Sequence, residues 1–263
     1  MHEKIYVVDA FTSQPFSGNP AGVVLLEENH SDEWMLSVAR EVNLSETAFI
    51  LGKSDPKNLR WFTPTVEVPL CGHATLAAAH VLYSCNLMDS GEPIRFATLS
   101  GLIECQHKDD WIWMAFPAFD CVELKIDQKY VDALKSQPHK IFKTGVNLMA
   151  VYQDASEVIR ADPDMDKIRL LDAQGIIITS RFEKNSIDFI SRYFAPKIGI
   201  DEDPVTGSSH CSLAPYWGAI FEKEILIAEQ VSKRGGILKL KNLGDKIAIG
   251  GQAQTVFSGN LLV

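Results

Sequence analysis

The sequence predicts a mixed α+β fold made of two similar halves, and three observations carry this prediction. The pattern Arg-aromatic-Phe-x-Pro occurs twice, at residues 60–64 and 192–196. After a short acidic segment, each copy is followed by a glycine, Gly72 or Gly207, which opens an apolar run. Short alternating or β-rich runs, typical of strands, occupy much of the remaining chain. Features that recur in the same order indicate two copies of one architecture.

A looser match upstream of each arginine motif sets the limits of the two halves. Residues 16–26 and 142–152 both join Phe, Gly and Asn to a β-rich run, at similar distances before the motif. Chance similarity of short motifs is the alternative, and the shared order and spacing weigh against it. We expect one half at residues 1–118 and the other at residues 119–253, with a last strand near residues 254–263 that returns to the first half.

The local pattern of each segment predicts its type of element. Strands are expected at residues 4–10, 22–26, 47–52, 59–62, 94–98, 102–107, 111–116, 175–179, 187–194 and 247–250. Helices are expected at residues 31–42, 73–86, 130–134, 164–171 and 208–223. Ser31 has the position of an N-cap, and residues 73–83 are apolar nearly all round, as in a helix that lies in the interior. Residues 18–22 are expected to form a turn between strands.

Composition and charge disfavour several classes of protein. Of the 263 residues, 46% are hydrophobic and 22% are charged, as in an ordinary globular protein. The net charge of −9 gives no electrostatic reason to bind nucleic acid or an anionic membrane. Five cysteines without a CxxC pair favour reduced thiols, and neither a signal-peptide layout nor an apolar run of roughly 18 residues is present. We expect a cytoplasmic protein.

The two glycine-led helix starts are candidate ligand sites. The first-turn amides of a helix have no partners within the helix and lie at the positive end of its dipole. Gly72 with His73, and Gly207 with Ser208, would let a ligand approach these amides closely. Two such starts that faced each other across a cleft would bind a carboxylate within an acidic protein.

Two acidic residues are candidates for proton transfer. Glu46 stands between an expected helix and an expected strand, and a partly buried carboxylate there suits acid–base work near neutral pH. A capping or solvated glutamate at a turn is the alternative. Asp203 directly precedes the bend into the second helix, whereas Asp201 and Glu202 are expected to lie in a solvated turn.

A metal site is the main rival interpretation of these residues. Candidate ligands are Cys71, His73 and His80, or His210 and Cys211, but their spacing matches no zinc pattern. We expect no metal, with His80 and Cys211 packed in the core. No Gly-rich phosphate loop of the Walker or dinucleotide type occurs.

Four motifs in order resemble the PhzF-like phenazine biosynthesis family, within the diaminopimelate epimerase-like fold. They are Asp9-Ala-Phe11 with residues 16–24, Asn43-Leu-Ser-Glu-Thr47, Phe62-Thr-Pro64 with Glu67 and residues 71–75, and residues 202–209. The resemblance implies that each half is a β-barrel-like mixed sheet wrapped around a central helix, with the active site in a cleft between the halves. It also implies a homodimer.

The resemblance implies roles for single residues. Glu46 would be the acid/base, His73 and Asp203 would assist it, and Ser45, Gly72, Gly207 and Ser208 would bind the substrate. Racemases and epimerases of this fold use two cysteines, one at each central helix. Here Cys71 has the first of those positions and Thr206 the second, and a threonine hydroxyl is a poor base toward a carbon acid.

We therefore predict a cofactor-independent isomerase that moves a proton on a small (cyclic) carboxylate or amino acid. The substrate's identity does not follow from the motifs. An amino-acid racemase or epimerase of the same fold is one alternative. A non-catalytic protein that binds a metabolite or acts as a scaffold is the other.

Overall fold

The computed structural model describes residues 3–52 and 55–263. The chain divides into two compact units, of which the first comprises Met1–Ala115 with Gly250–Val263 and the second comprises Phe116–Ile249. Strand β8 (Trp111–Pro117) leads from the first unit into the second, and β17 (Lys246–Gly251) leads back.

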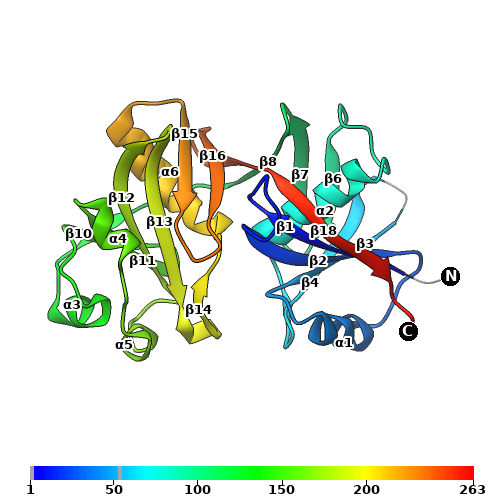
Figure 1. The fold of residues 1–263 in the computed structure, drawn as a ribbon, viewed down its shortest axis with the longest axis horizontal. Helices are drawn as coiled ribbons and strands as arrows, with labels where there is room; N and C mark the ends of the chain where they lie inside the picture. Colours follow the sequence, from blue (N-terminus) through cyan, green and yellow to red (C-terminus); the bar gives the residue numbers. More distant parts are fainter. Residues whose placement is uncertain (1–2, 53–54) are drawn as a thin grey trace. The chain divides into compact units, whose positions relative to one another are not determined.

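The described residues of the first unit form a mixed sheet and two helices (Figure 1). Its elements besides β8 are β1 (Lys4–Ala10), β2 (Asn19–Leu26), α1 (Asp32–Val42), β3 (Thr47–Leu51), β4 (Lys57–Phe62), β5 (Glu67–Val68), α2 (Gly72–Ser84), β6 (Ile94–Thr98), β7 (Gly101–Lys108) and β18 (Ala253–Asn260). Antiparallel pairs join β18 to β1, β1 to β2, β3 to β4, β4 to β5, β6 to β7 and β7 to β8. Parallel pairs join β2 to β3 and β4 to β6.

The second unit repeats this plan. Its elements besides β17 are β9 (Val122–Leu124), α3 (Gln128–Leu134), β10 (Lys140–Thr144), β11 (Asn147–Tyr152), α4 (Ala155–Ile159), α5 (Met165–Arg169), β12 (Ile176–Lys184), β13 (Ile187–Ala195), η1 (Pro196–Ile198), β14 (Ile200–Asp203), η2 (Gly207–Ser209), α6 (His210–Phe221), β15 (Ile225–Gln230) and β16 (Gly236–Asn242). Parallel pairs join β11 to β12 and β13 to β15, and the other pairs are antiparallel. Thus β10–β16 correspond in order and direction to β1–β7, and β9 flanks β10 as β18 flanks β1.

The repeated arginine motif joins equivalent strands in both units. Arg60 on β4 donates through Nε and Nη2 to the two carboxylate oxygens of Glu67 on β5, each at 2.7 Å. Arg192 on β13 does the same to Glu202 on β14, at 2.6 and 3.0 Å. Bidentate pairs of this kind fix orientation as well as charge. The expectation that Glu202 lies in a solvated turn is therefore wrong, because its partner stands on the neighbouring strand.

Each unit is packed around a helix. Helix α2 buries all its residues from His73 to Ala79, together with Val81 and Leu82, and contacts β1, β2, β3 and β18. Its alanines allow the strands to approach closely, as the all-round apolar pattern predicts. In the second unit α6 contacts β15 and β16 and buries Trp217.

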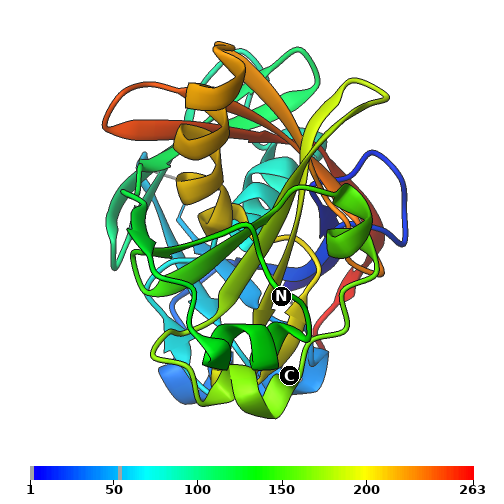
Figure 2. The ribbon, with the colours of Figure 1, turned by 90° about the vertical axis from the view of Figure 1, so that its left-hand side faces the viewer.

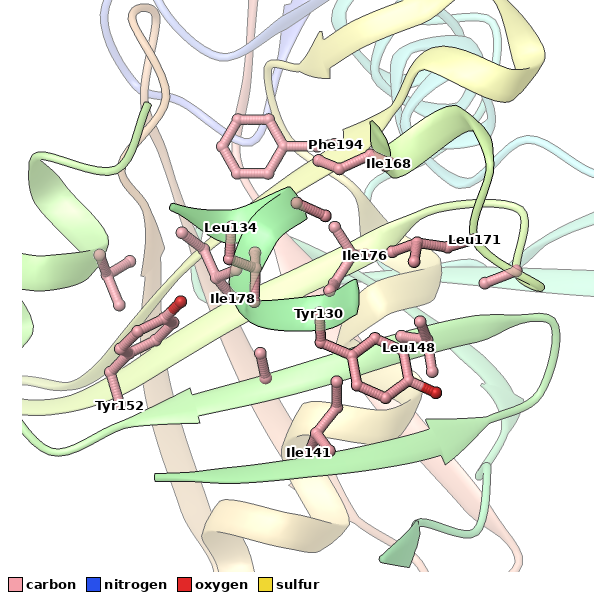
Figure 3. Packing of buried hydrophobic residues seen from close by; sticks show 14 of the residues in the cluster. Tyr130, Leu134, Ile141, Leu148, Tyr152, Ile168, Leu171, Ile176, Ile178 and Phe194 are labelled. Carbon is pink, nitrogen blue, oxygen red and sulfur yellow. The ribbon is translucent and has the colours of Figure 1, made fainter. Parts of the chain in front are cut away.

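The second unit also has an apolar cluster under its short helices. The cluster joins α3, α5 and strands β10–β13, and Figure 3 shows most of its side chains interleaved. Figure 2 shows α3 and α5 side by side, in agreement with their mutual contacts. In the described parts of the chain, no helix is long and apolar enough to cross a membrane.

Several local expectations need correction. Residues 19–22 belong to strand β2 rather than to a turn, and the change of direction falls just before them, where Phe16 and Gly18 have positive φ. The expected strands do not include β15 and β16, although buried residues alternate with half-buried or exposed ones in both. Glu229 in β15, and Lys239 and Lys241 in β16, shorten the apolar runs on which the assignment depends.

Candidate active site

In the first unit, Glu46, Cys71 and His73 form a compact group. Glu46 directly precedes β3, and its backbone carbonyl accepts a hydrogen bond from Gly22 N–H at 3.1 Å. His73 is the second residue of α2, and its Nε2 lies 3.3 Å from Glu46 Oε2. Its Nδ1 lies 3.5 Å from Cys71 Sγ. One imidazole therefore stands between a carboxylate and a thiol.

The contact between His73 and Glu46 is close without being a well-aligned hydrogen bond. Among the described residues, His73 Nε2 is a buried atom that lacks a partner with hydrogen-bond geometry. Catalytic hydrogen bonds are often long or misaligned before substrate binds. The group thus has the distance, though not yet the alignment, of an acid–base pair.

Burial determines the protonation state of His73. The side chain is 8% exposed, and this burial lowers its pKa to about 4, so the ring is neutral at pH 7. A neutral imidazole has one N–H donor and one acceptor nitrogen. A carboxylate ion only accepts hydrogen bonds. The tautomer with the proton on Nε2 therefore suits both neighbours, because Nε2–H then faces Glu46 and Nδ1 can accept from the Cys71 thiol.

The starts of the two central helices differ from those of the peripheral helices. Side-chain oxygens of Ser31, Asp127, Asp154 and Asp164 cap α1, α3, α4 and α5. Cys71 before α2 and Thr206 before η2 make no such side-chain cap bond. The first-turn amides at Gly72 and Gly207 are therefore not occupied by a cap side chain, as an anion site at a helix start requires.

In the second unit, Asp203 and Thr206 belong to a buried polar network. The Thr206 hydroxyl donates to Asp203 Oδ2. Gln230, at the end of β15 and fully buried, hydrogen bonds to this segment through both atoms of its amide. Burial, and then the charge of Asp203, raise the pKa of the nearby Tyr193. The segment before η2 is therefore held by the side chain of Gln230 at the end of β15.

The predicted site residues fall into two groups. The first unit brings Glu46, His73 and Gly72 together, with the half-buried Ser45 beside Glu46. The second unit places Asp203, Gly207 and the exposed Ser208 along one short segment. Their roles stay predictions.

Sequence reasoning missed one member of the polar network and misplaced another residue. Gln230 carries no signal, because a single glutamine at the end of an apolar strand is unremarkable in the sequence. His80 is half-buried rather than in the core, and its Nε2 lies 3.0 Å from Thr255 Oγ1. Cys211 is buried, as expected, and burial raises its pKa to about 12.

The Glu46 group also offers ligand types for a metal ion. One ligand atom from each of Glu46, Cys71 and His73 can be chosen so that all three lie within 4.8 Å of one another. The two shortest contacts, however, use different nitrogens of His73, which point away from each other across the ring. One ion can be bound by only one of them. The absence of a metal stays a prediction.

Comparison with known proteins reveals similarity along the whole chain. The family model described as phenazine biosynthesis-like protein (PhzC-PhzF) matches residues 8–259. An uncharacterized isomerase of Halalkalibacterium halodurans is 42% identical over 100% of both chains. The crystal structure of a PhzF-family phenazine biosynthesis protein from Enterococcus faecalis has a TM-score of 0.96, with 38% identity and full coverage of both chains.

More distant similarity concerns the fold alone. A probable proline racemase of Agrobacterium radiobacter is 10% identical, with a TM-score of 0.64 over 99% of this chain and 93% of its own. Together with the strand pattern of the two units, these likenesses confirm the predicted α+β fold of the diaminopimelate epimerase type.

Proposed function

The chain belongs to the phenazine biosynthesis-like (PhzC-PhzF) family and is an isomerase, and we propose that Glu46 moves a proton between two carbons of a small carboxylate. The observation that carries the proposal is the 3.3 Å approach of a neutral, buried His73 to the Glu46 carboxylate. A cyclic amino acid with conjugated double bonds is the substrate class that such chemistry suits, and no cofactor takes part.

The steps follow from the groups present. The Glu46 carboxylate takes a proton from one carbon, and the electron pair of the broken C–H bond moves into the conjugated system. Glu46, now a carboxylic acid, returns the proton to another carbon on the same face. Atoms and charge balance without an oxidant or reductant. A positioned acid/base of this kind contributes roughly 10²- to 10⁴-fold to rate.

His73 assists this transfer as a neutral hydrogen-bond donor. The Nε2–H of His73 faces Glu46, so it can hold the carboxyl group in place. It can donate a hydrogen bond to Glu46 both when Glu46 is a carboxylate and when it is a carboxylic acid. The uncapped amides at Gly72, and likewise those at Gly207, are each proposed as contacts for an anionic group of a substrate. To Ser45 and Ser208 we assign hydrogen bonds to the substrate, and to Asp203 the part of a second polar group that assists.

The rival functions are less well supported. A two-cysteine racemase needs a thiol before each central helix, and the second of these positions is occupied by Thr206, whose hydroxyl is engaged with Asp203. A protein that only binds a metabolite would exchange no carbon-bound hydrogen.

Solvent deuterium exchange tests the proposal. The protein is incubated in D₂O with L-proline, with trans-4-hydroxy-L-proline and with a cyclohexadiene amino acid, and deuterium on carbon is followed by proton NMR. We expect exchange into the cyclic diene, and the Glu46→Gln variant should lose it by roughly 10²- to 10⁴-fold while it keeps its fold. Glu41→Gln, at an exposed glutamate of α1, is the matched control and should keep the wild-type rate.

Two results would refute the assignment. A Glu46→Gln variant with the wild-type exchange rate would remove Glu46 from the chemistry. Exchange restricted to the α-carbon of proline would favour the racemase instead.

A further inference from the structure

We propose that Thr206 and Gln230 are positioning residues that hold the Asp203 carboxylate in one orientation. The effect on catalysis rests on the proposed function, whereas the effect on the orientation of Asp203 does not. The inference assigns a role to Thr206, which occupies the position of the second cysteine in racemases of this fold. It also assigns one to Gln230, a buried residue that the sequence analysis did not identify.

The hydrogen bonds of Gln230 fix the orientation of its amide. Gln230 Oε1 accepts from Thr206 N–H at 2.9 Å, and Nε2 donates to the backbone carbonyl of Asp203 at 2.7 Å. A backbone N–H only donates and a backbone carbonyl only accepts, so the amide cannot be turned round. Gln230 is 0% exposed, so no water competes for these bonds.

The same amide sets the direction of the Thr206 hydroxyl. Gln230 Nε2 also lies 3.2 Å from Thr206 Oγ1 and can only donate to it. The hydroxyl oxygen therefore accepts from Gln230 and uses its single proton for Asp203 Oδ2. The result is a series of hydrogen bonds with one direction, from Gln230 through Thr206 to Asp203.

This series of hydrogen bonds lies at the start of the second central helix. Thr206 is the cap residue before η2, in extended conformation, and its side chain is turned toward Asp203 rather than toward the helix amides. At the equivalent place in the first unit, Cys71 contacts His73 rather than the amides of α2. In both units the residue before the central helix thus contacts a predicted catalytic side chain and leaves the first amides uncapped.

The hydrogen bond from Thr206 restricts the orientation of the Asp203 carboxylate. A carboxylate on a rotatable side chain samples several orientations unless it is held, and a hydrogen bond from a hydroxyl that is itself held restricts that motion. Misplacement of a catalytic group by about 1 Å can cost about 10²-fold in rate. Loss of the Thr206 hydroxyl should therefore lower the turnover number more than it changes substrate binding.

The test compares Thr206→Val, which keeps the side-chain shape and removes the hydroxyl, with Thr206→Ser, which keeps the hydroxyl. We expect crystal structures to show Asp203 in more than one side-chain conformer in Thr206→Val and in one conformer in Thr206→Ser. On the cyclic diene probe, kcat of Thr206→Val should fall by roughly 10- to 100-fold with KM within about threefold, and Thr206→Ser should recover most of the rate.

Two further variants separate positioning from folding. Thr179→Val removes another fully buried hydroxyl of the same unit, which accepts from Trp217 Nε1 at 3.0 Å and donates to the Ile190 carbonyl at 2.7 Å. It should leave both Asp203 and kcat unchanged. Gln230→Met removes the first donor of the hydrogen-bond series. The Asp203 side chain should then become mobile even though the Thr206 hydroxyl is present.

The possible outcomes are distinct. A single, unmoved Asp203 conformer in Thr206→Val and Gln230→Met would overturn the proposal, whatever the kinetics. Loss of rate in Thr206→Val without movement of Asp203 would also overturn it, even with rescue by serine, because the hydroxyl would then act on the substrate itself. If Glu46→Gln retained full activity while Asp203 became mobile in Thr206→Val, the proposed function would fail and the positioning role would stand.

Discussion

At the scale of single residues, the imidazole of His73 connects two groups that could each carry a proton. Its Nε2 faces the Glu46 carboxylate at 3.3 Å and its Nδ1 faces the Cys71 thiol at 3.5 Å. The ring is neutral because burial lowers its pKa to about 4. A thiol that donates to Nδ1 favours the tautomer with a proton on Nε2. Under the proposed function, Cys71 is thus a partner of His73, and Glu46 is the group that takes the carbon-bound proton.

Replacement of Cys71 tests this division of labour. Cys71→Ala removes one weak hydrogen bond to His73, worth about 1 kcal/mol, so the deuterium exchange rate should fall by no more than about fivefold. A racemase that used Cys71 as acid or base would instead lose roughly 10²- to 10⁴-fold. The measurement is exchange into the cyclic diene, with Cys105→Ala, another buried cysteine of the first unit, as the control for fold. A loss of the larger size in Cys71→Ala alone would return the thiol to the chemistry.

The sequence predicts these residues unevenly. Glu46 and His73 belong to different elements, so no helical or strand spacing could place them together, and only the family resemblance linked them. The helix starts at Gly72 and Gly207 followed from the residues themselves. Gln230 could not have been found, because its role depends on a hydrogen-bond geometry that only the folded chain creates.

At the scale of elements, the two units have the same backbone hydrogen bond before equivalent strands but different residues at that position. In the first unit, Gly22 N–H on β2 donates to the Glu46 carbonyl just before β3, at 3.1 Å. The equivalent bond in the second unit runs from Leu148 N–H on β11 to the Gly175 carbonyl just before β12, at 3.0 Å. The position of Glu46 thus corresponds to Gly175. The second unit has no side chain there, so the proposed proton carrier occurs in one copy of the repeat only.

Packing explains why the second copy has a glycine. A Cβ added at Gly175 would lie 2.6 Å from the Tyr193 hydroxyl oxygen and 2.7 Å from the Phe194 carbonyl oxygen. Gly175→Ala should lower the free energy of unfolding by roughly 1–3 kcal/mol, the usual cost of overpacking. Gly91→Ala is the control: a Cβ at this exposed turn would meet no atom within 4 Å, so its effect should stay within about 0.5 kcal/mol. Urea denaturation gives both values, and equal stability of the two variants would contradict the packing argument.

The arginine motifs illustrate what a short pattern can and cannot predict. Their repetition correctly indicated equivalent elements, because Arg60 and Arg192 occupy matching places on β4 and β13. Their acidic partners, Glu67 and Glu202, were not predicted, since pairing across strands depends on register and not on distance along the chain. The same limit applies to β15 and β16, whose alternation is plain once their neighbours are known.

At the scale of the whole molecule, a duplicated architecture carries buried titratable groups in both copies. His73 is the second residue of α2 in the first unit, and His210 is the first residue of α6 in the second, where its Nδ1–H donates to the Thr206 carbonyl at 2.8 Å. Burial lowers the pKa of each from 6.5 to about 4. Both rings must therefore be folded into the core as neutral groups, and this links stability to pH.

The homodimer and the cytoplasmic location stay predictions.

The pH dependence has a definite sign. Between pH 6.5 and about 4, an unfolded histidine binds a proton while the folded one does not, so the unfolded state gains protons and stability falls as the pH falls. The contribution of His210 is fully present above pH 6.5, and its loss by pH 4 amounts to at most about 3 kcal/mol, at about 1.4 kcal/mol per pH unit. His210→Asn keeps a side-chain donor near the Thr206 carbonyl and cannot charge. Urea unfolding of wild type and variant across this range should show the difference between them shifting in favour of the variant as the pH falls. His139→Asn, at an exposed histidine, is the control, and a constant difference between wild type and His210→Asn would show that the buried ring does not govern acid stability.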